Sequence, residues 1–508
     1  MDDALPAWSK LCTLFTHLKT KEEPMAYNTL KALKPRENLT EKYRKDRAEL
    51  EKDFQKHLDE WKQTAVMVVN LAKKYGDRDQ LHHKPYGQWE TFSWNQVSEI
   101  MFAVAGALLD SGLKEGDRTG IFSPNRAEWH LSDLGSQLIR CVPVPIYATN
   151  TEKEVEYLVN DAEIKVLFVG RQMHYDRSYA LLDRCPSLEK IVVFHRGTKI
   201  HDDKRVVMWD DFLEEGRKSG RKTEIEEIMG RAHYDDICTI IYTSGTTGEP
   251  KGAVHTHKSL MQNSWGVGRY VEGCFTDNDS DLCMLPLTHV LQRSWDYGIF
   301  SIKMQIWYCE DHNQILEYLV EANPSVMNGA PRIFEKIYST LYTKIKEASP
   351  VKQKIFHWSV GVGKQHGDKV LASKQPGPWL SFKRKIADKL VLHKIRGLFG
   401  KNMHHVNYGG AALNPEIERF FFNCGMLVVS GYGLTETSPV ISMNGPHCFK
   451  FGSIGPASPL VDIRIDPETG EIQAKGPNIF KEYYKKPERT KEAFTEDGWF
   501  KSGDVGVM

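Results

Sequence analysis

Short apolar segments alternate with amphipathic stretches through most of this chain, and that alternation limits the folds open to it. The segments that predict strands are 118–125, 141–148, 165–170 and 190–194. Residues 93–113 predict an amphipathic helix ending at a glycine, and Thr151 with Glu154 predicts a capped helix start. Such alternation is typical of a mostly parallel sheet with helices on both faces, so we expect an α/β fold.

The two ends of the chain have a different pattern. Residues 38–75 carry apolar side chains at helical spacing, and Asn38 followed by Glu41 resembles a capping box, so one or two helices are expected there. After about residue 430, short segments are split by Gly, Pro, Asp and Asn, which indicates a small, bent β subdomain. We predict a helical extension (1–75), an α/β core (76–430) and a small β subdomain (431–508).

Composition excludes several classes of protein. The 67 basic and 67 acidic residues cancel, so no general attraction to nucleic acid is expected. No apolar run approaches the roughly 18 residues that span a bilayer. The nine cysteines are scattered without a C-x-x-C pair, and the acidic start is unlike a secretory signal. We expect a cytoplasmic protein with reduced thiols.

The sharpest chemical signal is the loop that follows the apolar residues Ile240 and Ile241. It reads Tyr-Thr-Ser-Gly-Thr-Thr-Gly-Glu-Pro-Lys-Gly (242–252) and combines hydroxyls, glycines and a lysine. Glycines let backbone N–H groups approach an anion, which favours a phosphate cradle over an ordinary polar surface loop. The motif of P-loop proteins is not matched, because Pro250 precedes the lysine and Gly252 follows it.

This loop resembles the signature of the adenylate-forming superfamily, which includes acyl-CoA synthetases, luciferases and peptide-synthetase adenylation domains. Further segments resemble that superfamily in the same order: LPLTHVLQR (285–293), YGGAAL (408–413), GYGLTET (431–437) and GWFKSGD (498–504). The resemblance extends from about residue 65 to the end of the chain. It implies the large N-terminal domain of these enzymes, with two parallel-sheet α/β subdomains and a small distorted β-barrel subdomain.

The resemblance also implies a reaction, in which a carboxylate attacks the α-phosphate of ATP and expels pyrophosphate. Such a site must position and neutralise two anions. Glu436 would ligate Mg²⁺, and Thr435 would hydrogen-bond the α-phosphate. The β- and γ-phosphates would be held by Thr243, Ser244, Gly245, Thr246, Thr247, Gly248 and Lys251.

The remaining implied roles concern the nucleoside and the acyl group. Gly409, Gly410 and Ala411 would leave room for adenine. Tyr432 would stack on the base within the loop that contains Gly433, and Asp504 would bind the ribose hydroxyls. His289 would orient the acyl carboxylate or line its pocket, although a lone histidine is more often a packed or helix-capping residue. The expected catalytic residues are therefore Thr243, Lys251, His289, Thr435 and Glu436.

Two segments, 125–149 and 387–402, resemble the long-chain type of acyl-CoA synthetase, which implies a medium- to long-chain fatty acid and CoA as co-substrate. Tyr408 and Gln292 depart from the family pattern. These departures bear on the detailed shape of the substrate pocket and not on the class of reaction. Two alternatives stay open: a fatty-acyl-AMP ligase that loads a carrier protein, and a non-catalytic module that binds nucleotide or acyl groups.

The region 351–401 is strongly basic, with twelve Lys or Arg against two Asp, a balance of +10. Interleaved apolar residues make it either a set of solvated helix faces or a peripheral surface for anionic lipid. The superfamily also has a small C-terminal domain carrying a further lysine. The sequence stops before it, so we expect a truncated chain with impaired adenylation.

Overall fold

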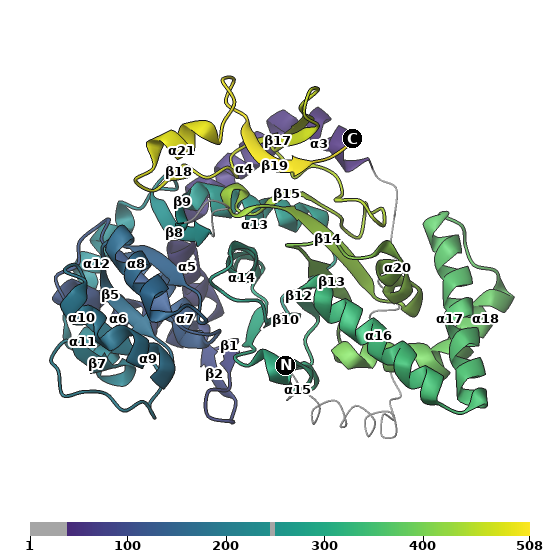
Figure 1. Cartoon of the computed structure of the whole chain (residues 1–508), viewed down its shortest axis with the longest axis horizontal. Coiled ribbons are helices and arrows are strands. Elements are labelled where there is room, and N and C mark those ends of the chain that lie inside the picture. Colours follow the sequence, from purple (N-terminus) through teal and green to yellow (C-terminus); the bar gives the residue numbers. More distant parts are fainter. Residues whose placement is uncertain (1–37, 244–248) are drawn as a thin grey trace.

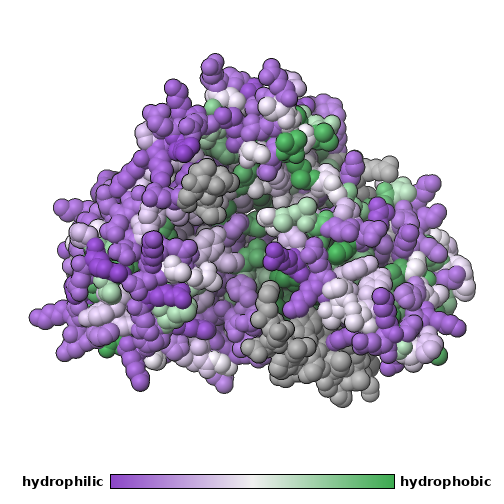
Figure 2. Space-filling model, in the orientation of Figure 1, coloured by the Kyte–Doolittle hydropathy of each residue, from purple (hydrophilic) through white to green (hydrophobic). Residues whose placement is uncertain are grey.

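The structure is a computed structural model that describes residues 38–243 and 249–508 (Figure 1). Residues 1–37 of the predicted extension and 244–248 of the predicted phosphate loop lie outside these ranges. Two large sheets organise the fold, and two small antiparallel sheets join them toward the top of the view. Figure 2 shows this face as mostly hydrophilic, with hydrophobic residues gathered around the hollow in the middle of the molecule.

The left-hand lobe contains a five-stranded sheet with the order β4-β3-β5-β6-β7, in which every pairing is parallel. This confirms the four strands predicted from apolar segments. Its strands are β3 (Arg118–Phe122), β4 (Val142–Ile146), β5 (Ile164–Val169), β6 (Lys190–Val193) and β7 (Val206–Met208).

Helices cover both faces of this sheet, as the alternation predicted. One face packs against α8 (Glu152–Ala162), α9 (Gln172–Tyr179) and α10 (Leu181–Arg184). The other packs against α6 (Trp94–Asp110), α7 (Ala127–Leu138), α11 (Trp209–Lys218) and α12 (Lys222–Gly230).

An eight-stranded sheet forms the centre, with the order β15-β14-β13-β12-β10-β11-β1-β2. Its six central strands run parallel, and β2 and β15 pair antiparallel at the two edges. The strands are β1 (Asp79–His83), β2 (Glu90–Ser93), β10 (Ser280–Cys283), β11 (Gln305–Tyr308), β12 (Val326–Gly329), β13 (His405–Tyr408), β14 (Leu427–Gly433) and β15 (Val440–Met443).

This central sheet is also covered on both faces, so both its faces are buried. One face packs against α5 (Thr64–Tyr75), α13 (His257–Tyr270) and α14 (Val290–Ile302). The other packs against α15 (Ile315–Ala322), which follows η1 (His312–Gln314), and against α16 (Pro331–Glu347), α17 (Pro350–Leu371) and α20 (Pro415–Cys424).

Three helices, rather than the one or two expected, occupy residues 38–75: α3 (Leu39–Lys45), α4 (Arg47–Trp61) and α5. Phe54 and Leu58 of α4 pack on Met261 and Trp265 of α13. The extension therefore lies against the central part of the fold.

The two small sheets are antiparallel and complete the upper part of the molecule. One has the order β18-β9-β8, from β8 (Ile237–Thr243), β9 (Lys251–Thr256) and β18 (Glu482–Tyr483). The other has the order β16-β17-β19, from β16 (Asp462–Ile465), β17 (Glu471–Lys475) and β19 (Phe500–Val505), with α21 (Pro487–Glu492) before β19. The predicted start of the small β subdomain, residue 431, lies inside β14, which is a strand of the central sheet.

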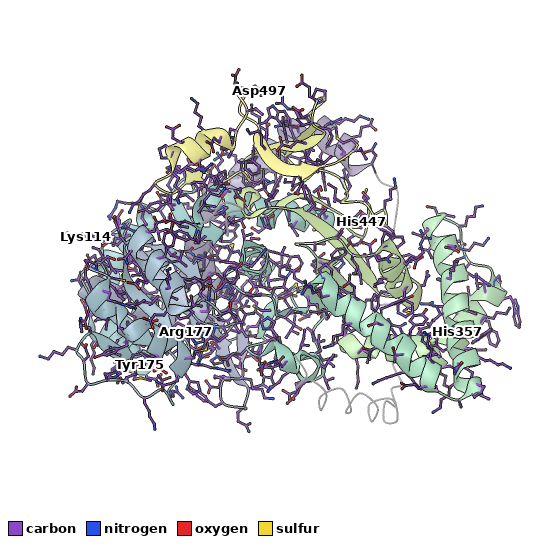
Figure 3. The ribbon with its side chains drawn as sticks, in the orientation of Figure 1. Lys114, Tyr175, Arg177, His357, His447 and Asp497 are labelled. Atoms are coloured by element: carbon purple, nitrogen blue, oxygen red, sulfur yellow. The ribbon has the colours of Figure 1, made fainter. Side chains whose placement is uncertain are left out.

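A helical arm lies at the right edge of the view, where α17 is followed by α18 (Pro378–Ala387). His357 on α17 marks this edge in Figure 3, whereas Asp497 marks the top beside the small sheet. The chain returns from the arm through η2 (Asp388–Leu392), α19 (His393–Arg396) and η3 (Gly397–Phe399). Within the described ranges, no helix combines the length and apolar character needed to cross a bilayer.

Candidate functional site

The predicted phosphate loop connects the antiparallel strands β8 and β9. Thr243, the last residue of β8, lies opposite Lys251, the first residue of β9, and its Oγ1 donates to the Lys251 carbonyl over 3.5 Å. The hairpin therefore brings together the two described ends of the loop. The predicted residues 244–248 lie outside the described residues, so their placement stays a prediction.

Tyr483 connects Lys251 to Glu436. Strand β18 pairs with β9 and places the Tyr483 ring 4.3 Å from the Lys251 Nζ, measured to the ring centroid. The Tyr483 hydroxyl donates to Glu436 Oε1 over 2.7 Å. Glu436 is buried in the short helix η4 (Thr435–Thr437), directly after β14. Two residues predicted for phosphate and metal are thus joined by a third side chain.

Sequence reasoning did not identify Tyr483 as part of the site. Its contact with Glu436 spans 47 positions, and its own segment indicated only a short strand. Burial and the neighbouring Glu436 carboxylate raise the pKa of Tyr483 well above its usual value. The hydroxyl therefore keeps its proton at neutral pH and serves as a donor to the carboxylate.

A cavity of about 1160 Å³ opens beside the ends of β13, β14 and β19. It brings together five residues that the sequence assigned to the nucleotide: Gly410, Ala411, Tyr432, Gly433 and Asp504. Thr435 and Glu436 lie in η4, which begins two positions after Gly433, and do not line this cavity.

Tyr432 and Asp504 both line this cavity, called the nucleotide cavity below after the residues predicted for it, and are hydrogen-bonded to each other. The Tyr432 hydroxyl, from β14, donates to Asp504 Oδ2, from β19, over 2.9 Å. Burial, the largest cause, raises the pKa of Tyr432, and the Asp504 carboxylate raises it further. This hydrogen bond links the central sheet to the small sheet at the mouth of the cavity.

Close packing explains two of the glycines in the predicted adenine loops. A Cβ on Gly433 would overlap the carbonyl oxygen of Pro439. A Cβ on Gly409 would lie 3.2 Å from Leu291 Cδ2 and 3.3 Å from the Gly431 oxygen. The backbone at these positions has little room for a side chain, because other parts of the protein occupy the adjacent space. The role of these loops toward adenine stays a prediction.

His289 caps α14, so the ordinary interpretation of a lone histidine applies here. Its Nδ1 accepts a hydrogen bond from the Leu291 amide over 3.1 Å. Since Nδ1 accepts, the neutral ring carries its proton on Nε2 and can donate it to another group. Burial lowers the pKa of His289, which favours this neutral form.

A second cavity, of about 40 Å³, lies between α13, α14 and the central sheet. Its apolar walls include Val267, Trp295 and Ile299. Tyr408 and Gly431 line both this cavity and the nucleotide cavity, so the two adjoin there. We refer to it below as the apolar cavity.

The two residues that depart from the family pattern are bound to neighbouring residues. The Tyr408 hydroxyl donates to Glu418 Oε1 over 2.6 Å. The Gln292 amide donates to Asp296 Oδ1 over 2.6 Å, and its Oε1 accepts from the Leu285 backbone over 3.2 Å. Both side chains are buried, and Tyr408 lines both cavities whereas Gln292 lines neither.

Comparison with known proteins gives one family and a consistent set of relatives. The model of the family described as "AMP-binding enzyme" matches residues 69–484. The long-chain-fatty-acid–CoA ligase FadD15 of Mycobacterium bovis is 31% identical over 425 residues, which cover 83% of this chain and 68% of that protein. Fatty acyl-CoA synthetase A of Dictyostelium discoideum is 31% identical over 455 residues, covering 85% of this chain and 65% of that protein.

A solved structure gives the same fold. The inhibitor-bound N-terminal domain of FACL13 from Mycobacterium tuberculosis superposes with a TM-score of 0.63 at 20% identity, covering 87% of this chain and 96% of that domain. At this identity the similarity concerns the fold alone. It confirms the predicted α/β architecture with parallel-sheet subdomains.

Proposed function

Since this chain belongs to the AMP-binding enzyme family, we propose that it activates a medium- to long-chain fatty acid with ATP. A carboxylate oxygen attacks the α-phosphorus, the bond to pyrophosphate breaks, and acyl-AMP forms. The CoA thiol then attacks the acyl carbon and AMP leaves. The observation that carries this proposal is that the nucleotide cavity adjoins an apolar cavity at Tyr408 and Gly431. The fatty-acid activity named for the relatives supports it.

The residues around the nucleotide cavity fit ATP. Gly410 and Ala411 line the cavity and would leave room for the base, Tyr432 would offer a ring face for stacking, and Asp504 would offer carboxylate oxygens to the ribose. Gly409 does not line this cavity, because Leu291 and the Gly431 carbonyl take the space beside it. The hairpin between Thr243 and Lys251 would hold the β- and γ-phosphates together with residues 244–248, and Thr435 would bind the α-phosphate. His289, with a proton on Nε2, would orient the attacking carboxylate.

Mg²⁺ fits the site with Glu436 as its protein ligand. Mg²⁺ is usually bound by one or two carboxylates together with substrate phosphates and water. Among the described residues, no three His, Cys, Asp or Glu side chains come together as a metal-binding cluster. When bound, the ion neutralises phosphate charge, while Tyr483 holds Glu436 in place.

The apolar cavity fits the first part of an acyl chain. Its volume of about 40 Å³ is that of only a few carbon atoms, so a longer chain requires side chains of α13 or α14 to move. Trp295 lines this cavity, whereas Tyr297 does not. The Tyr297 hydroxyl instead donates a hydrogen bond to Asp133 Oδ2, with an O–O distance of 2.6 Å. We propose that Trp295 contacts the acyl group and that Tyr297 has a structural role.

Acid-dependent pyrophosphate exchange tests adenylation directly. Lys251→Met and Glu436→Gln remove the two charges, and each is expected to lower exchange about 100-fold or more. Lys114→Met, an exposed lysine on the left-hand lobe in Figure 3, is the matched control and should leave the rate unchanged. Equal rates in all four proteins would contradict the assignment of Lys251 and Glu436.

The same assay separates the alternatives. No exchange by the wild-type protein with any fatty acid would favour a non-catalytic binding module. Exchange without CoA-dependent thioester formation would favour a ligase that loads a carrier protein. The names of the relatives, a long-chain-fatty-acid–CoA ligase and a fatty acyl-CoA synthetase, support CoA as the proposed co-substrate.

We further propose that α18 and η2 contact an anionic lipid surface. Trp379 is 67% exposed and Phe382 is 53% exposed, and Ile386 and Leu390 continue the same helical face. Lys383 Nζ lies 5.2 Å from the Trp379 ring centroid, so the apolar stripe is flanked by positive charge. This pattern is typical of helices that lie in a membrane interface.

Vesicle sedimentation distinguishes this role from a solvated helix face. Wild-type protein should sediment with vesicles containing phosphatidylserine and less with pure phosphatidylcholine, and added salt should release it. The double variant Trp379→Ala/Phe382→Ala should lose most of this binding. Met173→Ala removes a comparably exposed apolar side chain elsewhere and should retain it. Binding that is equal for both variants and both lipids would refute the proposal.

A further inference from the structure

A strip of buried polar side chains lies on the central sheet beneath α14. Asn328 on β12 and Asn407 on β13 occupy neighbouring positions in parallel register, with exposed fractions of 1% and 5%. Asp281 on β10 faces the same helix, because the Trp295 indole donates to its Oδ1 over 2.8 Å. His405 lies two residues before Asn407, on the same face of the strand.

Several polar atoms of this strip have no hydrogen-bond partner within the described part of the chain. For Asn328 this holds for both the amide nitrogen and the amide oxygen. It also holds for Asn407 Nδ2, His405 Nδ1 and Asp281 Oδ2. By contrast, Asn407 Oδ1 is paired with His405 Nε2 over 2.8 Å. A buried amide without partners is destabilising, and in native proteins such groups usually serve a ligand or an ordered water.

The two asparagines are also part of the wall of the apolar cavity. Asn407 directly precedes Tyr408, one of the two residues shared with the nucleotide cavity. An acyl chain that enters from the reacting carboxylate therefore passes the asparagine pair close to its carboxyl end. The surrounding wall is apolar, so plain methylene groups would leave these amides unpaired.

We propose that Asn328 and Asn407 bind a neutral oxygen substituent, a hydroxyl or carbonyl, near the carboxyl end of the acyl chain. The inference rests on the proposed function and specifies its substrate class as fatty acids that carry an oxygen substituent near the carboxyl end. An amide offers both a donor and an acceptor, which suits a hydroxyl. No lysine or arginine belongs to this strip of described residues, so a second carboxylate on the substrate would lack a counter-charge.

The test compares palmitate, β-hydroxypalmitate and ω-hydroxypalmitate as acids in pyrophosphate exchange. The wild-type ratio of kcat/KM for the β-hydroxy acid over palmitate should exceed the ratio for the ω-hydroxy acid. Asn328→Leu, close to Asn in shape, should lower the β-hydroxy ratio about tenfold, chiefly through the hydroxy acid. Ile299→Leu, an apolar change in the same wall, should affect all three acids alike.

Two further measurements keep the outcome decisive. Asn328→Leu removes an unpaired amide, so the melting temperature of this variant should equal or exceed that of the wild type. Asn407→Leu is a second variant for the same comparison of acids. Calorimetric binding of the free acids reports selectivity without turnover. If wild type and Asn328→Leu show the same ratio by both methods, the amides bind water or serve packing, and the proposal is overturned. If selectivity appears in binding but no acid supports exchange, it is the proposed enzymatic function that fails.

Discussion

The ring face of Tyr483 contacts the Lys251 ammonium, and the Tyr483 hydroxyl donates to the Glu436 carboxylate. Without the ring, an opposite-charge pair could form and compete with phosphate for the lysine and with metal for the glutamate. Tyr483 is therefore proposed as a positioning residue. It keeps both charges available for ligands while limiting where the carboxylate points.

This role predicts a graded effect of substitution. Tyr483→Phe keeps the ring and removes the hydroxyl, so the Mg²⁺ concentration for half-maximal exchange should rise about tenfold. Tyr483→Leu also removes the contact with Lys251 and should raise the KM for ATP. Titration of Mg²⁺ at saturating ATP measures the first effect. Tyr484→Phe is the adjacent control, and an equal Mg²⁺ shift in that variant would contradict the role of Tyr483.

At this scale, sequence reasoning identified residues that lie in recognisable loop motifs. It missed residues whose role depends on contacts with residues far away in the sequence. Gly410, Tyr432 and Asp504 were expected in one site and line one cavity. Asn328 has no loop signature, because its significance comes from its neighbour Asn407 on a strand 79 positions away. Such pairs depend on strand order, which local patterns do not specify.

Among the elements, helix starts show how local chemistry determines a boundary. Thr151 Oγ1 accepts from the Glu154 amide over 3.4 Å, and Glu154 Oε2 accepts from the Thr151 amide over 2.7 Å. This capping box was predicted from two residues and is confirmed. The same reasoning applied to residues 38–75 gave too few helices, because the helical stretch is interrupted twice without a glycine or proline to signal it. The interruptions lie at Asp46, between α3 and α4, and at Lys62, with φ of 56°.

Removal of the Thr151 cap should destabilise the fold measurably. Thr151→Ala leaves an amide in the first turn of α8 without its acceptor, and the free energy of unfolding should fall by about 1 kcal/mol. Urea unfolding followed by circular dichroism measures this change. Thr151→Ser keeps the hydroxyl and should remain within a few tenths of a kcal/mol of wild type. An equal loss in both variants would show that the methyl group, and not the cap, is responsible.

For the whole molecule, buried histidines link stability to pH. Burial is the largest cause in each case, and it disfavours the charged ring. The pKa is lowered to about 4 for His57 and His174 and to about 3 for His130, His255, His257 and His405. The unfolded chain binds protons at an ordinary pKa of about 6.5, so below that pH it holds more protons than the folded chain.

The free energy of unfolding should therefore decrease as the pH falls from about 6.5 toward 4. Above pH 7 these histidines should not raise the free energy of unfolding further, because they are neutral in both states. Several buried histidines acting together should lower the free energy of unfolding by several kcal/mol between pH 7 and pH 5. Urea midpoints measured across this range test the expectation. His257→Gln should flatten the slope, whereas the exposed control His233→Gln should not. A midpoint that stays constant from pH 7 to pH 5 would contradict it.

If Asp504 binds the ribose as proposed, its hydrogen bond with Tyr432 makes nucleotide binding an exchange of hydrogen-bond partners rather than a simple addition. The carboxylate proposed for the ribose accepts a hydrogen bond from the Tyr432 hydroxyl. A ribose hydroxyl that binds the same oxygen must displace the Tyr432 hydroxyl, which must then donate to another acceptor. Under this proposal, the affinity for ATP is the difference in free energy between the two hydrogen-bonded arrangements, so a weaker Tyr432–Asp504 bond favours nucleotide binding.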